Sequence, residues 1–246
     1  NPHAQYRERY HARRLLAEAV AARHFAALVA AFMAVDTYRL GSAPKDGIED
    51  RALKAVLLDL LAAANTPETH AIAEGHFRRA WNITDRLAAL GVINRSDHPR
   101  RGEIMGEAVA AWKDRLSAYT GYLRLVGRGI HDDVFEMMAA EERRPGFRIE
   151  HPSHSRALYI PFTSNNLMLW TDRGIGWVAD KVIDLSAVNQ FVANQLVQCF
   201  QHVKNLADDL RPPVIRALER IRDGISSSAH PSVYGTVVAY LGDLPA

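Results

Sequence analysis

The stretch TPETHAIAEGHFRRAWNITDRLAALGVINRSDHPRRGEIM, residues 66–105, decides the predicted fold. It contains two helical pieces separated by Gly75, a residue that permits the positive φ a tight turn between helices requires. The second piece is rich in leucine and ends at Gly91, which is typical of the position just after a helix. Residues 92–93 favour a strand, and residues 94–102 form a turn-rich basic loop. This order of elements predicts a winged helix-turn-helix.

The rest of the chain is expected to be mainly α-helical. We predict a winged helix-turn-helix with long flanking helices, followed by a C-terminal helical region that carries a small β element. The expected domains are an N-terminal helix at 1–47, the winged helix-turn-helix with a dimerisation helix at 48–126, and an α+β region at 127–246. Three sets of β-like residues favour strands in this last region, at 158–160, 167–170 and 176–178.

Composition restricts the classes of protein that fit. The chain has 246 residues, of which 48% are hydrophobic and 24% charged, so it can bury a core. The net charge of +2 excludes a polybasic protein, and one cysteine excludes a disulfide framework. The longest apolar run, residues 25–35, is shorter than the roughly 20 residues a membrane-spanning helix needs. We therefore expect a cytoplasmic protein that does not contact a membrane.

A heptad-like seam follows the basic loop. Apolar residues recur at alternating spacings of four and three along an expected helix over 106–126. The seam consists of Met105, Val109, Trp112, Leu116, Tyr119, Leu123 and Val126. It can pack within its own domain or against a second subunit, in which case the protein would be a homodimer through 105–126.

The basic residues between positions 78 and 101 are of the types that contact DNA. A recognition helix places arginine against guanine and asparagine against adenine in the major groove, and loop arginines contact phosphates. The candidates on the helix are Arg78, Arg79, Asn82 and Arg86, and those in the loop are Arg95, His98, Arg100 and Arg101.

The join between this helix and the loop resembles the MarR-type winged-helix regulators. The matching signature residues are Leu87, Gly91, Val92, Ile93 and Arg95, and those of the basic wing are Asp97, Pro99, Arg100 and Arg101. The resemblance covers residues 48–126. It implies a bacterial transcription regulator that binds double-stranded DNA as a dimer and that has room for a small-molecule effector.

Two other functions stay open. The first is a non-enzymatic helical module that binds other proteins. The second is a ribonuclease, because Arg124 and His131 have a spacing that resembles the one in HEPN-type ribonucleases. His70, His76 and the pair His131–Asp132 are metal-ligand types at an unspecific spacing. We therefore expect no metal and no cofactor, and an enzyme is the less favoured alternative.

Overall fold

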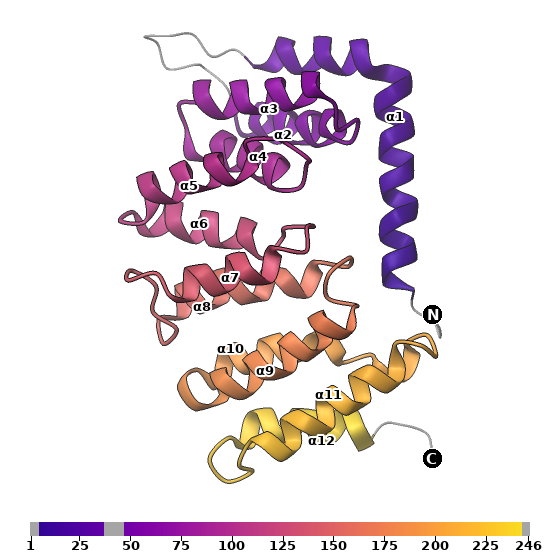
Figure 1. The fold of residues 1–246 in the computed structure, drawn as a ribbon, viewed down its shortest axis with the longest axis vertical. Coiled ribbons are helices and arrows are strands. Elements are labelled where there is room, and N and C mark those ends of the chain that lie inside the picture. The colour runs from indigo at the N-terminus through magenta and orange to yellow at the C-terminus, as the bar shows by residue number, and fades with distance from the viewer. Residues whose placement is uncertain (1–4, 37–46, 243–246) are drawn as a thin grey trace. The chain divides into compact units, whose positions relative to one another are not determined.

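The computed structural model describes residues 5–36 and 47–242, and every regular element in these ranges is a helix (Figure 1). The first six helices are α1 (Tyr6–Val35), α2 (Ile48–Ala62), α3 (Pro67–Arg79), α4 (Ile83–Asn94), α5 (Arg101–Trp112) and α6 (Leu116–Val126). The next helices are α7 (Val134–Glu142), α8 (Pro152–Tyr159), α9 (Asp172–Val188), α10 (Gln190–Val197), α11 (Arg211–Gly224) and α12 (Pro231–Gly242). Short 3₁₀ turns occupy Ile160–Ser164, Gln198–Phe200 and Val203–Asn205. The expectation of a mainly α-helical fold is confirmed.

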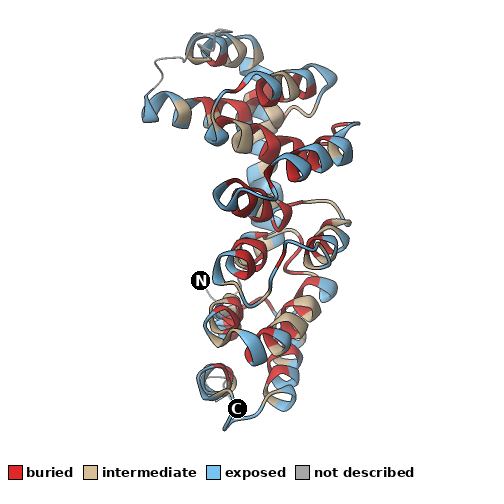
Figure 2. Cartoon of the chain, turned by 90° about the vertical axis from the view of Figure 1, so that its left-hand side faces the viewer, coloured by how far each residue is buried: buried red, intermediate tan, exposed pale blue. Residues whose placement is uncertain are grey.

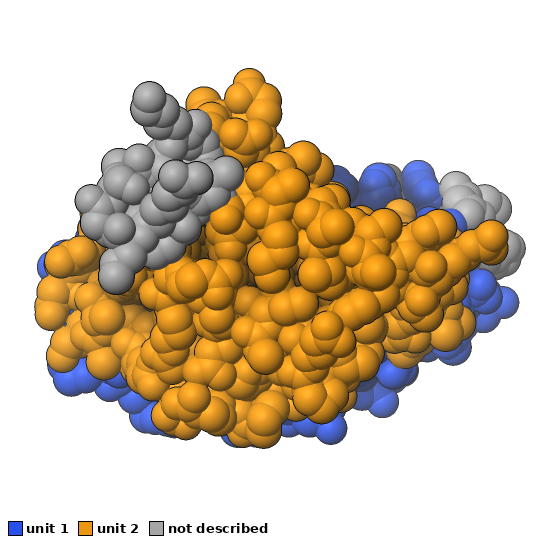
Figure 3. Space-filling view, turned by 90° about the horizontal axis from the view of Figure 1, so that it is seen from above, with its two compact units in different colours: residues 1–10, 132–246 blue, residues 11–131 orange. Residues whose placement is uncertain are grey.

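The chain forms two compact units (Figure 3). Unit 2 comprises residues 11–131, and unit 1 comprises residues 1–10 with 132–246. In unit 2, α4 packs against α2, α3, α5 and α6. In unit 1, α9 packs against α10 and α11, and α11 also packs against α12. Buried residues gather where neighbouring helices meet (Figure 2). Packing between helices that are close in sequence is the organisation of a helical repeat array.

The stretch 66–105 does not form a winged helix-turn-helix. Thr66 does begin a helix, since its Oγ1 accepts a hydrogen bond from Thr69 N at 3.3 Å. However, Gly75 lies inside α3, and the chain breaks later, at residues 80–82. Helix α4 then continues through Gly91 to Asn94, so residues 92–93 are helical and no wing strand is present in the described ranges.

The expected dimerisation helix is two helices, α5 and α6, with a turn at residues 113–115 between them. The seam is buried within unit 2: Trp112 is 4% exposed, Tyr119 1% and Leu123 0%. Leu116 is the exception at 53%. Of the two alternatives left by the heptad pattern, packing inside the domain is the one the structure shows, and the expected homodimer seam is wrong.

The β element predicted for residues 158–178 is also wrong. Residues 158–159 end α8, residues 167–170 form turns, and residues 176–178 lie in α9. The aromatic side chains that favoured strands form a cluster in unit 1 instead. The ring of Trp177 lies 4.7 Å from that of Phe162 and 5.9 Å from that of Tyr159. Aromatic residues in a helical core produce the same local composition as a strand.

Helix α1 is long and apolar enough to cross a membrane by length and composition alone. Only about a tenth of its apolar stretch is buried within the structure, at 11%. The backbone departs from helical geometry at His24, with φ −119° and ψ 20°, so α1 consists of two segments.

We expect Gly174→Ala to destabilise the protein. A Cβ at Gly174 would lie 2.1 Å from the carbonyl oxygen of Met168 and 2.5 Å from that of Leu169. Because backbone must move to make room, the free energy of unfolding should fall by roughly 1–3 kcal/mol in a denaturant titration.

Gly176→Ala is the matched control in the same helix, because a Cβ there meets nothing within 4 Å. Alanine favours helix over glycine by up to about 1 kcal/mol, so this variant should be at least as stable as the parent. Equal stability of the two variants would contradict the close approach at Gly174.

Candidate interaction site

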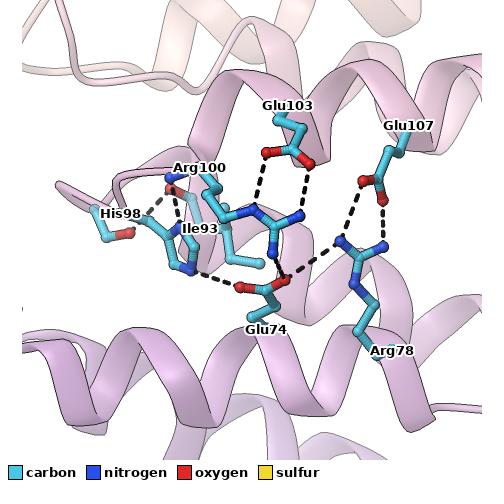
Figure 4. Close-up of polar contacts among 8 residues, drawn as sticks. Glu74, Arg78, Ile93, His98, Arg100, Glu103 and Glu107 are labelled. Atoms are coloured by element: carbon cyan, nitrogen blue, oxygen red, sulfur yellow. Dashed lines mark hydrogen bonds and ion pairs between the residues drawn. The ribbon is translucent and has the colours of Figure 1, made fainter.

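Six charged or titratable side chains converge between α3 and the start of α5 (Figure 4). We call this group the α3–α5 charge cluster. It consists of Glu74, Arg78, His98, Arg100, Glu103 and Glu107. Glu74 and Arg78 stand on α3 and Glu103 and Glu107 on α5. Sequence reasoning found the basic members and missed the three glutamates, although Glu74–Arg78 and Arg100–Glu103 have spacings at which helical side chains meet.

Glu74 is the centre of the cluster. Its Oε1 accepts hydrogen bonds from Arg100 Nη1 at 2.7 Å and from Arg78 Nη2 at 3.3 Å. Its Oε2 lies 3.4 Å from His98 Nε2. One carboxylate of α3 therefore holds two guanidinium groups and an imidazole.

The two arginines are each shared with a second carboxylate. Arg100 donates from Nε and Nη2 to the two oxygens of Glu103, at 2.8 and 2.6 Å. Arg78 binds Glu107 in the same two-pronged manner. Arg100 lowers the pKa of Glu103, and Arg78 lowers the pKa of Glu107. Bidentate pairs of this kind fix geometry as well as charge, so the cluster fastens α3 to α5.

The remaining predicted DNA contacts also have partners inside the chain. The Oδ1 of Asn82 caps α4 by accepting from Asp85 N at 2.8 Å, and Arg86 Nε donates to the Ala80 carbonyl at 2.7 Å. The other three donate to neighbouring side chains: Arg79 to Asp36 at 2.8 Å, Arg95 to Asp59 at 2.5 Å and Arg101 to Asn94 at 3.0 Å. The eight candidates lie within three helices, at the caps of α4 and α5 and, for His98, in the turn before α5, not on one recognition helix and a wing.

Asn65 fastens the turn at residues 95–100 to the junction between α2 and α3. Its Oδ1 accepts from Asp97 N at 3.0 Å and lies 2.9 Å from His70 Nε2, while its Nδ2 donates to Asp97 Oδ2 at 2.6 Å. Asn65 has a positive φ of 49°, a conformation that asparagine tolerates better than most residues. The basic loop is thus part of the packed unit.

The two candidates for a ribonuclease lie at the end of α6 and in the loop after it. The Nε2 of His131 makes a 3.0 Å hydrogen bond with the carbonyl oxygen of Ser96, and Arg124 is exposed on the last turn of α6. Across the described ranges, no group of three or more His, Cys, Asp or Glu side chains could hold a metal ion.

Burial shifts the pKa values of two histidines of unit 2. Burial lowers the pKa of His98, although Glu74 opposes the shift, and burial lowers the pKa of His70, with Asp97 opposing it. Asp36 differs: burial raises its pKa, but the neighbouring side chains of His76 and Arg79 outweigh this and lower it to about 2.

We expect Glu74→Gln to destabilise the protein more than Glu103→Gln. Glu74 is 21% exposed and serves three cationic or titratable partners, whereas Glu103 is 55% exposed. Loss of the Glu74 charge should cost roughly 1–2 kcal/mol of unfolding free energy in a urea titration. Equal losses in the two variants would show that Glu74 is not the centre of the cluster.

Stability should decrease as the pH falls from 7.5 to 5.5. His98 and His70 have lower pKa values in the folded chain than the ordinary value of about 6.5. Below that value the unfolded chain binds protons that the folded chain does not, so acid favours unfolding.

His98→Gln should reduce this pH dependence, measured as the change in melting temperature between the two pH values. His154 in unit 1 also has a pKa lowered by burial, so part of the dependence should remain. His202→Gln, at an exposed position, serves as the control. An unchanged slope in H98Q would exclude His98 as a contributor.

Comparison with known proteins identifies the relatives of this chain. The family described as "Domain of unknown function (DUF3458_C) ARM repeats" matches residues 1–233. Aminopeptidase N of Caulobacter vibrioides is 26% identical over 191 residues, which cover 76% of this chain and 21% of that protein. Aminopeptidase N of Escherichia coli is 24% identical over 180 residues, covering 72% of this chain and 21% of that protein.

A solved structure shows the same fold. The crystal structure of Legionella pneumophila aminopeptidase A in complex with aspartic acid superposes with a TM-score of 0.84 at 19% identity. The match covers 99% of this chain and 30% of that one. The chain spans about a fifth of the length of the curated relatives it matches.

These findings correct the predicted identity. The resemblance to MarR-type regulators is wrong, because a helical-repeat family matches nearly the whole chain and its relatives are aminopeptidases. The expected double-stranded DNA partner and the role in transcription are wrong for the same reason. The chain belongs to the family of DUF3458_C ARM-repeat domains.

Proposed function

We propose that this chain is a helical repeat domain of an aminopeptidase and supports a catalytic part that lies elsewhere on the same polypeptide. The observation that carries the proposal is the match of residues 1–233 to one ARM-repeat family whose curated relatives are named aminopeptidase N. Those relatives are about five times as long as the segment they share with this chain.

The geometry of the chain supports a structural role. The α3–α5 charge cluster pairs its acids and bases with one another, an arrangement that holds helices together and leaves no group poised for proton transfer. Helical repeat arrays present extended surfaces to other parts of a protein. The proposal is therefore a specific form of the helical interaction module that the sequence left open.

The test uses the natural polypeptide that contains residues 1–246. We expect it to release the amino-terminal residue from aminoacyl-anilide substrates, whereas residues 1–246 alone should release none. The Gly174→Ala variant of the natural polypeptide should lose activity at a lower temperature than the parent, and Gly176→Ala should not.

Two results would overturn the proposal. One is that the natural polypeptide, although folded, does not release the amino-terminal residue from the substrates. The other is hydrolysis by residues 1–246 alone at the rate of the natural polypeptide.

A further inference from the structure

The second segment of α1, residues 25–35, contains no charged side chain. Its inner side is fixed to α3: Phe32 is fully buried, and its ring meets that of His76 edge-on at 5.2 Å. The next residue after the helix, Asp36, pairs with Arg79 of α3 at 2.8 Å. This segment is therefore a packed part of unit 2 and has a defined outer side.

The outer side of the segment is apolar as well. We call it the α1 outer face, and its exposed members are Ala26, Ala27, Ala30, Ala31, Met33 and Ala34. Met33 is 50% exposed. A helix that is apolar on all sides is covered by neighbours in the assembled protein, because the exposed half has no polar group to interact with water.

A membrane does not fit this face. Eleven residues of helix rise about 16 Å, roughly half the thickness of a bilayer's hydrocarbon core. The segment cannot be lengthened by the rest of α1, because the backbone leaves helical geometry at His24 and Arg23 beside it is exposed and charged.

A further helix does fit. The alanines give a low surface that a second helix can approach to the usual interaxial distance of about 8–10 Å. In repeat arrays each unit buries its apolar side against its neighbour, and only a terminal unit carries a polar outer side. The α1 outer face lacks the polar side chains of a terminal unit, which indicates that the array continues beyond it.

We propose that the α1 outer face is the docking surface for another helix of the same polypeptide. The proposal rests on the proposed function, since it takes the chain to be one part of an aminopeptidase-length protein. It specifies which surface of this chain joins the remainder and that the contact is apolar.

The test measures how fast single thiols in the natural polypeptide react with a maleimide, read at each position by peptide mass spectrometry. Ala30→Cys and Ala26→Cys report on the α1 outer face, and Ser117→Cys at an exposed position of α6 is the control. Both substitutions on α1 are small, so folding should be retained. We expect A30C and A26C to react at least tenfold more slowly than S117C. This ratio of reaction rates should not change when the protein is diluted a hundredfold.

Three results would overturn the proposal: equal rates at all three positions, protection that disappears on dilution, and protection that requires lipid vesicles. The second would identify another copy of the chain as the occupant, and the third a membrane. Amino-terminal hydrolysis measured on the same samples tests the proposed function separately, because a bare α1 outer face in an active enzyme contradicts only the docking surface.

Discussion

The arrangement of unit 2 depends on one buried ion pair. Lys54 Nζ of α2 donates to Asp85 Oδ2 of α4 at 2.5 Å, and both side chains are 3% exposed. The same carboxylate accepts from Asn82 Nδ2 at 3.0 Å, while Asn82 caps the first turn of α4. Leaving one such charge buried without its partner costs about 3–5 kcal/mol, whereas an exposed pair contributes about 0–1 kcal/mol. The start of α4 is therefore fixed where Asp85 meets Lys54.

From this start, α4 runs through the centre of unit 2. Leu90 and Ile93 are fully buried, and the helix passes close to α6. A Cβ at Gly91 would lie 3.1 Å from Leu125 Cδ2, and one at Gly121 would lie 2.5 Å from Leu87 Cδ1. These glycines serve close packing of two helices, which offsets the roughly 1 kcal/mol that glycine costs inside a helix.

The helical class of the fold and several helix starts could be predicted from the sequence, because they depend on local chemistry. Thr66 and Pro67 begin α3 through capping and proline geometry that act within a few residues. The winged-helix interpretation failed where a residue's role depends on distant partners. Gly91 fits the pattern of a helix end as well as that of a helix interior, and only the packing of α4 against α6 distinguishes these alternatives. Gly75 likewise lies inside α3 and not at a turn.

The candidate site illustrates the same limit. Its arginines could be found by counting charge along residues 78–101, but several of their partners lie far away in sequence. Asp36 is 43 residues from Arg79, Asp59 is 36 from Arg95, and Glu74 is 26 from Arg100. A local excess of positive charge therefore became a set of internal ion pairs once the chain folded.

The surfaces of unit 2 differ in how completely their side chains are satisfied. The charged surface at α3 and α5 has its acids and bases matched within the chain, so it gains little from a further partner. The apolar surface at residues 26–34 has no internal match, and removing it from water would contribute about 25 cal/mol for each Å² buried. The excess of positive charge can be read from the sequence, whereas the exposure of an alanine-rich helix face is known only from the structure. The free energy available for assembly resides on the alanine-rich face.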